Sequence, residues 1–571
     1  MISLDGVRGP SSRGAWTGVA AAWFVAVAAL LAWLLATPVG LFREQLKALQ
    51  FWSLESCVVV GIVPGVLVLR EIGRGLERRD SVRMAALAVL GLTLTVFVAP
   101  RTNRIYYDEQ IYQNVGQNMA DLKLAQICNA GVVEYGRLEC SNGEYNKQPY
   151  AYPHLLSLAY RVFGVHEAAA FVVNAAAMAV TVCGVYLLVF ILFSDRSAAF
   201  FAALLVALIP EQIVWSATAA SEPTASAFCV IALVCAAHFG QSRSRASLIA
   251  AGTALAYSVQ FRPESLLVIP VVGLMLLQRA PVELARPRFW WTGLLVFLLL
   301  WVHFGHMYLV RNEGWGTTDA RLSLKYVAAN FAVNGGFFLG DERFPILFTV
   351  LAFVGLASRR LAGRAWILLY FLLFFGIDLL FYAGSYDYGA DVRYSLMTYP
   401  PLAVLGGLGA SRVVGRVARF RVAHAEGVVA AGMMFQFLWY APLVRAVTQE
   451  AWAARADVRF AKSLVPLLRG NAVVLTHNPG MFQVWGVNAG QMSLVVDNPA
   501  YLEYLGRRYP DNVYLHWNFW CNVQEPVQPA FCMKALQGQP GEIVREYREG
   551  DQRFALYRLR TLPAGSKRTE K

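Results

Sequence analysis

The feature that most limits how this chain can fold is a series of long apolar runs that recurs over its first 443 residues. VAAAWFVAVAALLAWLLA (19–36) and FVVNAAAMAVTVCGVYLLVFILF (171–193) are two of them. A helix needs roughly 20 such residues to cross a bilayer. Only 15% of the residues are charged, against about a quarter in soluble proteins. The sequence therefore predicts an α-helical polytopic membrane protein.

The apolar runs divide the chain into about 13 predicted transmembrane helices. They cover residues 15–37, 52–69, 83–100, 167–193, 198–215, 222–240, 246–261, 265–279, 290–310, 345–359, 365–384, 394–410 and 427–443. If the N-terminus is cytoplasmic, every loop on that side carries Lys or Arg, as the positive-inside rule requires. The same rule explains the net charge of +13, so we expect no binding to nucleic acid. The first run is too long for a cleaved signal sequence and is predicted to be an anchor.

This topology divides the chain into four regions. They are the N-terminal helices (1–100), an outer loop with interfacial helices (101–166), the membrane core (167–443) and an outer domain (444–571). The outer domain contains strand-like runs, NAVVLTH, MSLVVD, NVYLHW and RFALYRL, and a helix-like run after an Asn cap, NPAYLEYLGRRY. It is predicted to be a small extracytoplasmic α/β domain with a disordered tail after Leu562.

The cysteines agree with this orientation. Four of the eight lie in predicted helices, and the other four form two local pairs in outer regions, Cys128 with Cys140 and Cys521 with Cys532. Pairs at this spacing in an oxidising compartment predict disulfides. Four free thiols are the alternative. Zinc is not favoured, because no spacing of His and Cys matches a zinc site.

Two adjacent acids, Asp108 and Glu109, follow the third predicted span on the outer face. Side by side they repel each other unless a cation, a basic partner or a shared proton offsets the charge. The simpler interpretation is a helix N-terminus, where the helix dipole favours acids, on an amphipathic helix that lies on the membrane.

Other polar residues recur on the same face. The stretch YNKQPYAYPHLLSLAYRVFG (145–164) contains Lys147, Tyr150, Tyr152 and His154. Helix ends further along the chain carry candidate supporting residues, Glu222, Glu264 and Asp391, and two arginines, Arg262 and Arg393. Each alone could be a snorkelling anchor, but several at separate helix ends predict a polar cavity.

A cavity of this composition suits sugar transfer from a lipid-linked phosphosugar. Arg and Lys bind phosphate, and a carboxylate takes the proton from an acceptor hydroxyl. The transition state resembles an oxocarbenium ion. A lipid phosphate is a good leaving group, which explains why the outer regions need no nucleotide-binding loop.

This pattern resembles the GT-C superfamily of membrane glycosyltransferases, and most closely the protein O-mannosyltransferases and the lipid A aminoarabinose transferases. The resemblance rests on Asp-Glu at 108–109, KQPYAYP at 147–153, Arg-Pro-Glu at 262–264 and Arg-Tyr at 393–394, and it covers roughly residues 100–410. It implies an inverting glycosyltransferase that takes a sugar from a polyprenyl-phosphate donor on the outer face. The acceptor could be a lipid, a glycan or a protein.

The resemblance also implies roles for individual residues. Asp108 would act as the base or bind the acceptor, and Glu109 would position it. The predicted donor-binding residues are Lys147, Arg262, Arg393, Tyr150, Tyr152 and His154. No cofactor is required, and a divalent metal, if one binds, would do so at Asp108.

Two departures from the family pattern stand out. Relatives usually have one span before the acidic loop and this chain has three predicted spans there, and Asn146-Lys147-Gln148-Pro149 stands where relatives carry His-Lys-Pro-Pro.

Two other functions fit parts of the sequence. A lipid or polysaccharide transporter would place charges in mid-span, where Asp378 is the clearest case. A scaffold using the C-terminal domain would leave the acidic pair unexplained. Heavy use of Ala, Gly and Arg suggests a GC-rich bacterium, so we expect the protein in a bacterial inner membrane, with the C-terminal domain on the periplasmic or extracellular side.

Overall fold

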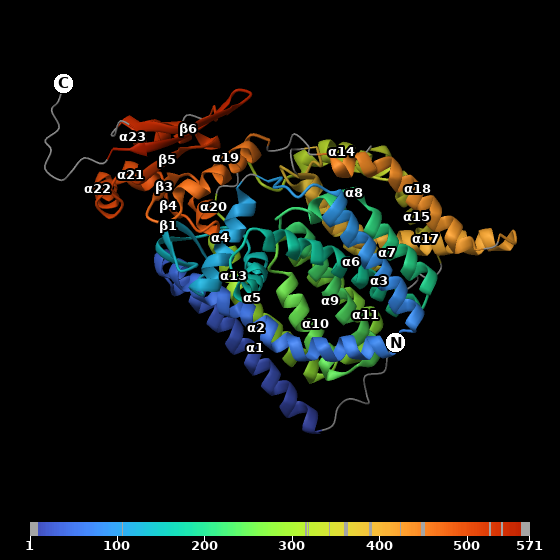
Figure 1. Ribbon diagram of the computed structural model, residues 1–571. Helices are drawn as coiled ribbons and strands as arrows, with labels where there is room; N and C mark the ends of the chain where they lie inside the picture. Colours follow the sequence, from blue (N-terminus) through green and yellow to red (C-terminus); the bar gives the residue numbers. More distant parts are fainter. Residues whose placement is uncertain are drawn as a thin grey trace. The chain divides into compact units, whose positions relative to one another are not determined.

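The apolar runs form helices throughout the computed structural model of the chain. It describes residues 10–105, 107–313, 317, 319–341, 343–358, 364–387, 391–422, 424–446, 452–524, 527–537 and 541–560; the predicted disordered tail lies outside them. Each of the 13 predicted spans contains a helix. The helices of the membrane region are α1 (Pro10–Ala36), α2 (Val39–Arg74), α3 (Arg78–Thr93), α6 (Ala168–Phe193), α7 (Arg196–Leu208), α8 (Pro210–Ser216), α9 (Glu222–Ser242), α10 (Arg245–Ser258), α11 (Val268–Arg279), α12 (Pro281–Leu284), α13 (Pro287–Val310), α14 (Val327–Gly340), α15 (Ile346–Leu356), α16 (Trp366–Leu380), α17 (Tyr399–Arg419) and α18 (Ala425–Arg445) (Figure 1).

Fewer helices than predicted are long and apolar enough to cross a bilayer on their own. Among the described residues there are 7, or 8 if the bent pair α7 and α8 is one span. The two helices of this pair meet at 61°, because Pro210 begins α8 and cannot continue the hydrogen bonding of α7. Helices α15 and α16 are apolar but shorter. The chain is thus a helical membrane protein.

The described chain forms two compact units. The first comprises residues 1–101, 147–152 and 174–446, and the second comprises 102–146, 153–173 and 447–571. The second unit therefore combines the first outer loop with the C-terminal region. Its helices are α4 (Asp108–Asp121), most of α5 (Ala151–Phe163), α19 (Trp452–Leu468), α20 (Pro479–Val484), α21 (Ser493–Asp497), α22 (Pro499–Arg508) and α23 (Val527–Gln537).

A mixed sheet of 7 strands forms the centre of the second unit, in the order β2-β1-β4-β3-β5-β7-β6. The strands are β1 (Gln126–Glu134), β2 (Arg137–Tyr145), β3 (Val473–Thr476), β4 (Asn488–Gln491), β5 (Val513–Trp517), β6 (Gly541–Glu549) and β7 (Gln552–Leu559). The parallel strands β4, β3 and β5 lie in the middle, and β1 pairs antiparallel with β4 (Figure 1). A hairpin from the outer loop thus completes a sheet built by residues more than 300 positions later.

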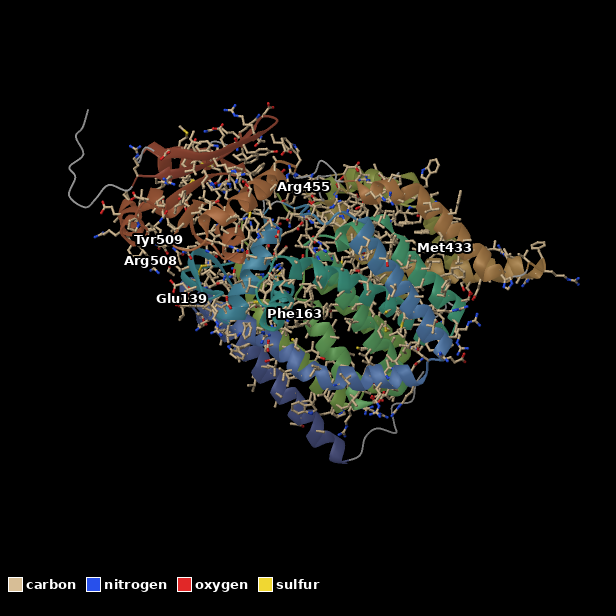
Figure 2. All side chains as sticks on the ribbon, viewed as in Figure 1. Glu139, Phe163, Met433, Arg455, Arg508 and Tyr509 are labelled. Carbon is tan, nitrogen blue, oxygen red and sulfur yellow. A yellow bond between two sulfur atoms is a disulfide. The ribbon has the colours of Figure 1, made fainter. Side chains whose placement is uncertain are left out.

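Contacts outside the sheet also join the hairpin to the C-terminal region. The Arg508 guanidinium lies 3.8 Å from the Glu134 carboxylate at the end of β1. Within the C-terminal region, the same guanidinium lies 5.7 Å from the ring centroid of Tyr509; Figure 2 labels Arg508 and Tyr509. Both contacts are near the surface, so they contribute little to stability. The pairing of β1 with β4 and the hydrogen bond from the Val133 backbone N–H to the Asn488 side chain at 2.9 Å carry the attachment.

One predicted strand is wrong. The run MSLVVD contains helix α21, and the strand lies just before it, where β4 pairs with β3. The backbone N–H of Met492 donates to the carbonyl of Thr476 at 2.9 Å, beyond the last paired residues. The chain leaves the sheet after β4, and Val495 and Val496 then form part of a helix despite their preference for strands. The runs NAVVLTH, NVYLHW and RFALYRL contain the predicted strands, and NPAYLEYLGRRY contains the predicted helix.

Both predicted disulfides are present. Cys128 and Cys140 join β1 to β2, and Cys521 and Cys532 join the segment after β5 to α23. The other four cysteines, Cys57, Cys183, Cys229 and Cys235, are free thiols.

Candidate active site

The acidic pair begins helix α4. Glu109 is fully buried, and its carboxylate accepts hydrogen bonds from the Asn103 amide at 2.5 Å and from the backbone N–H groups of Arg104 and Ile105 at 2.8 and 3.1 Å. These bonds fix the loop that leads into the helix. Asp108 precedes Glu109 in the first turn and is half-buried. Glu109 is thus held by the loop before α4, and Asp108 is the less buried of the two acids.

Helix α4 is held by the C-terminal region of its own unit. The Asn114 amide donates to Gln483 on α20 at 2.8 Å, and its carbonyl accepts from the Cys128 backbone at 2.9 Å. The two helices approach closely because residue 480 is glycine: a Cβ there would lie 2.7 Å from Asn114 Cβ. The simpler interpretation is confirmed in that the two acids form the N-terminus of a helix, but ten residues of α4 are buried within the protein, so the expected surface helix is wrong.

In the first unit, two arginines converge on one buried carboxylate. Glu222, at the start of α9, is 1% exposed. Its Oε1 accepts a hydrogen bond from a terminal nitrogen of Arg262. The same oxygen accepts a second one from Nε of Arg393, at 2.8 Å. Arg262 also pairs with Glu264, and Arg393 pairs with Asp391 at 3.1 Å. Five predicted residues from three separate segments are thus brought together.

A tyrosine completes this cluster. The hydroxyl of Tyr394 accepts from Arg393 at 3.0 Å, and the two guanidinium carbons lie 5.0 Å (Arg262) and 4.7 Å (Arg393) from its ring centroid. Contacts of this kind hold a guanidinium in place by cation–π attraction. The sequence pattern Arg-Tyr pointed to this residue, but nothing in it assigned the tyrosine a role.

The charges in the cluster do not cancel. Two guanidinium groups face three carboxylates, which gives a net charge of −1 when all five groups are ionised. Burial raises the pKa of the Asp391 carboxyl to about 6, although Arg393 opposes the shift. Below about pH 6, protonation of Asp391 therefore brings the cluster close to zero charge.

The KQPYAYP stretch forms the turn into α5 and packs inside the protein. The backbone N–H of Ala151 donates to the Gln260 carbonyl at 3.1 Å, and the Tyr257 hydroxyl donates to the Ala151 carbonyl at 3.3 Å. Tyr150 and Tyr152 are fully buried, and the Tyr150 ring lies edge-on to His306 at 5.4 Å. This burial favours a role in holding the stretch over stacking on a sugar.

The remaining predicted site residues fall in both units. Lys147 is half-buried in the first unit. His154 is fully buried in the second, where its backbone carbonyl accepts from Ser157 at 2.7 Å. The second unit also holds a buried pair that sequence reasoning missed, Asp457 and His516, with carboxylate oxygen and ring nitrogen 3.0 Å apart. No sequence signal marks this pair, since both residues lie in segments that read as core.

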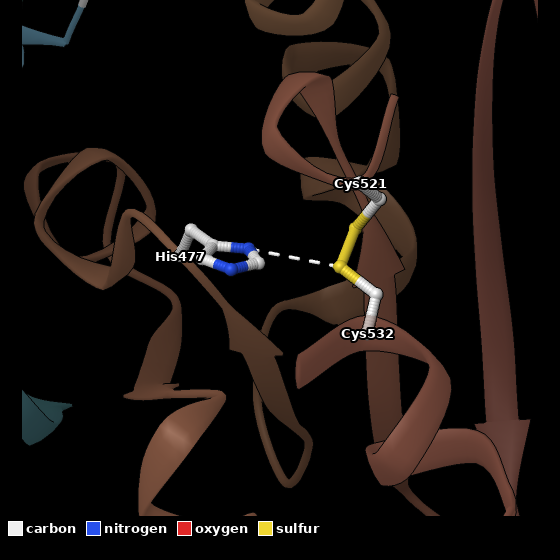
Figure 3. Close-up of side chains that lie close together, drawn as sticks. All are labelled: His477, Cys521 and Cys532. Atoms are coloured by element: carbon white, nitrogen blue, oxygen red, sulfur yellow. Dashed lines mark hydrogen bonds between the residues drawn. A yellow bond between two sulfur atoms is a disulfide. The ribbon is translucent and has the colours of Figure 1, made fainter. Parts of the chain in front are cut away.

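One group of potential metal ligands occurs among the described residues. His477, Cys521 and Cys532 place a ligand atom each within 4.8 Å of one another, and the Cys532 sulfur is 4.0 Å from the His477 ring nitrogen (Figure 3). The two sulfurs are bonded to each other, so the thiolates that a soft metal requires are absent. The group is a disulfide beside a half-buried histidine.

Comparison with known proteins agrees with the resemblance in the sequence. Residues 147–306 match the family model described as dolichyl-phosphate-mannose-protein mannosyltransferase. This segment contains Lys147, Glu222, Arg262 and Glu264. No curated protein sequence matches the chain.

Several solved structures share the fold. Crystal structures of ArnT from Cupriavidus metallidurans superpose with a TM-score of 0.53 at 14% identity, in the apo state over 84% of this chain and 98% of that one. With undecaprenyl phosphate bound to ArnT, the shares are 85% and 99%. Arabinofuranosyltransferase AftD from mycobacteria gives a TM-score of 0.50 at 14% identity, over 85% of this chain and 42% of that one. The predicted resemblance is confirmed by the family match together with the fold.

Proposed function

We propose that this membrane glycosyltransferase of the GT-C type transfers a sugar, with inversion, from a polyprenyl-phosphate donor to an acceptor on the outer face of a bacterial inner membrane. The observation that carries the proposal is the convergence of Arg262 and Arg393 on Glu222. Guanidinium groups held in fixed positions suit a phosphate. The undecaprenyl phosphate bound to ArnT supports a donor of the same class.

In the proposed reaction the acceptor hydroxyl attacks the anomeric carbon from the face opposite the phosphate. The new C–O bond forms as the bond to the phosphate oxygen breaks, and polyprenyl phosphate leaves with the electron pair. Asp108 takes the hydroxyl proton, and Lys147, Arg262 and Arg393 bind the phosphate. No resident cofactor is required; a divalent cation at Asp108 would help to orient the acceptor. The acceptor is a lipid, a glycan or a protein.

The alternative is a transporter that moves the lipid-linked sugar without cleaving it. The observation in its favour is Asp378, a buried carboxyl within α16 that accepts a hydrogen bond from Tyr386 at 3.0 Å. Buried acids in membrane helices often mark a transport path.

The two functions differ in the fate of the donor. Purified protein in vesicles is supplied with undecaprenyl-phosphate mannose or an undecaprenyl-phosphate pentose, each labelled in the sugar, and with membranes from the expressing cell as acceptor. A transferase releases undecaprenyl phosphate and moves the label to another molecule, which lipid extraction and mass spectrometry measure. Passage of intact donor across the bilayer, with neither donor consumed, would contradict the proposal.

Donor binding is expected to depend on Asp391. The sugar phosphodiester is ionised throughout the range pH 5–7.5, so it binds better when Asp391 is protonated and the cluster is not negative. Because the pKa of Asp391 is about 6, the KM for the donor should rise severalfold, up to about tenfold, as the pH increases from 5 to 7.5. The variant Asp391→Asn should keep the low KM for the donor at both pH 5 and pH 7.5. A pH profile of the variant with the slope of the wild type would exclude this explanation.

A further inference from the structure

We propose that the C-terminal region positions Asp108 through a buried chain of polar contacts that starts at the neighbouring residue, Tyr107. The inference rests on the proposed function, in which Asp108 is the base. It makes Tyr107, Asp457 and His516 positioning residues for sugar transfer, although none of them would touch the substrate.

The chain of contacts lies within the second unit. The Tyr107 hydroxyl donates to Oδ2 of Asp457 on α19, which also accepts from the backbone N–H of Phe519 at 3.3 Å. Asp457 Oδ1 lies 3.0 Å from Nε2 of His516 on β5, and both side chains are completely buried. At the far end, Nδ1 of His516 is 3.2 Å from the hydroxyl of Thr476 on β3. This chain of contacts thus links three elements of the C-terminal region, α19, β5 and β3, to one tyrosine of residues 101–166.

Packing fixes the same tyrosine. Its ring lies edge-on to Phe519 at 6.5 Å and tilted against Trp520 at 6.1 Å, and it belongs to an apolar cluster formed mainly by the C-terminal region. A buried carboxylate is costly unless its oxygens are paired, so Asp457 binds the tyrosine hydroxyl strongly. The Tyr107 hydroxyl therefore makes a directional hydrogen bond within an otherwise apolar contact.

The hydrogen bond between Tyr107 and Asp457 affects Asp108 because Asp108 lies between two residues that are held in place. Tyr107 precedes the first turn of α4 as its N-cap, and its Cα is only about 3.8 Å from that of Asp108. On the other side, Glu109 is fixed by the backbone N–H groups of Arg104 and Ile105. If the hydrogen bond of Tyr107 is lost, Asp108 loses one of its two fixed neighbours. A displacement of about 1 Å can lower the rate of a positioned reaction by about 100-fold.

The test compares two tyrosines of the same cluster in the full-length protein. Tyr107→Phe removes only the hydroxyl that Asp457 accepts. Tyr514→Phe makes the same change on β5, at a buried residue of the same cluster that does not adjoin Asp108. Both are assayed with undecaprenyl-phosphate mannose or the pentose donor, whichever the wild type consumes, and their melting temperatures are measured by intrinsic fluorescence.

We expect Tyr107→Phe to lower kcat about 10- to 100-fold with unchanged KM for the donor, while Tyr514→Phe keeps the wild-type kcat. Asp457→Asn should also lower kcat, and the double variant should be no slower than the slower single variant, because both changes break the same hydrogen bond. Wild-type kcat in Tyr107→Phe, or equal losses in both tyrosine variants, would overturn the inference. If Tyr107→Phe does not fold, kcat and KM of Asp457→Asn decide in the same way. An inactive Asp108→Asn beside a fully active Tyr107→Phe would refute only the positioning role, whereas an active Asp108→Asn would refute the proposed base itself.

Discussion

Replacing Asp108 with asparagine is expected to lower kcat for sugar transfer about 100- to 10,000-fold, the usual contribution of a general base. Asparagine has nearly the same shape but cannot take the proton of the acceptor hydroxyl. Asp108 is half-buried in the first turn of α4, so the substitution removes the attraction of its charge to the helix N-terminus, about 0.3–1 kcal/mol. Initial rates of polyprenyl-phosphate release, at saturating donor and with equal amounts of folded protein, measure the effect.

Asp121→Asn is the matched control, because Asp121 ends the same helix and accepts a backbone hydrogen bond from Leu138 at 3.0 Å. This variant should transfer sugar at nearly the wild-type rate. If Asp108→Asn retains transfer within about threefold of wild type, or if Asp121→Asn is equally slow, Asp108 is not the base. The proposed mechanism would then need another proton acceptor.

The helices of this chain were predictable from the sequence, and most of the sheet was not. An apolar run of about 20 residues has few alternatives to a helix in a bilayer, so α1, α6 and α9 follow from local sequence alone. Strand β1 pairs along its length with the adjacent strand β2 in a hairpin. Its residues, QICNAGVVE, mix polar and small side chains, and its place in the larger sheet depends on two residues that pair with β4, far away in the sequence. A sheet joined by such distant pairing leaves no short-range pattern to detect.

The candidate site shows the same division. Arg262, Arg393 and Glu222 were predictable because acids and arginines recur at several separate ends of the predicted membrane helices, which single anchoring residues do not explain. Their meeting at one carboxylate oxygen depends on how α9 and the segments before α11 and α17 pack. Asp457 and His516 were not predictable, because buried polar groups in a soluble domain are identified by their partners and not by their sequence neighbours.

The largest stability effect is expected at Glu222. Its Oε1 lies between two guanidinium groups, and the residue is 1% exposed. Removal of one partner from a buried ion pair typically costs about 3–5 kcal/mol, because a buried charge is left without compensation. Without the Glu222 carboxylate between them, the positive charges of Arg262 and Arg393 would repel each other. Glu264 is the matched control: it pairs with Arg262 alone and its side chain is 16% exposed.

Glu222→Gln should therefore lower the melting temperature of the detergent-solubilised protein by several degrees and reduce its yield, since about 3–5 kcal/mol is a large part of the stability of a protein. Glu264→Gln should shift the melting temperature less, because a partly exposed pair loses less when it is broken. Sugar transfer by the folded fraction of Glu222→Gln should also fall, since neither arginine keeps its orientation toward the donor phosphate. Equal melting temperatures for wild type and Glu222→Gln would mean that the carboxylate does not hold the two arginines. A larger decrease in melting temperature for Glu264→Gln than for Glu222→Gln would mean that Glu264, and not Glu222, holds the arginines in place.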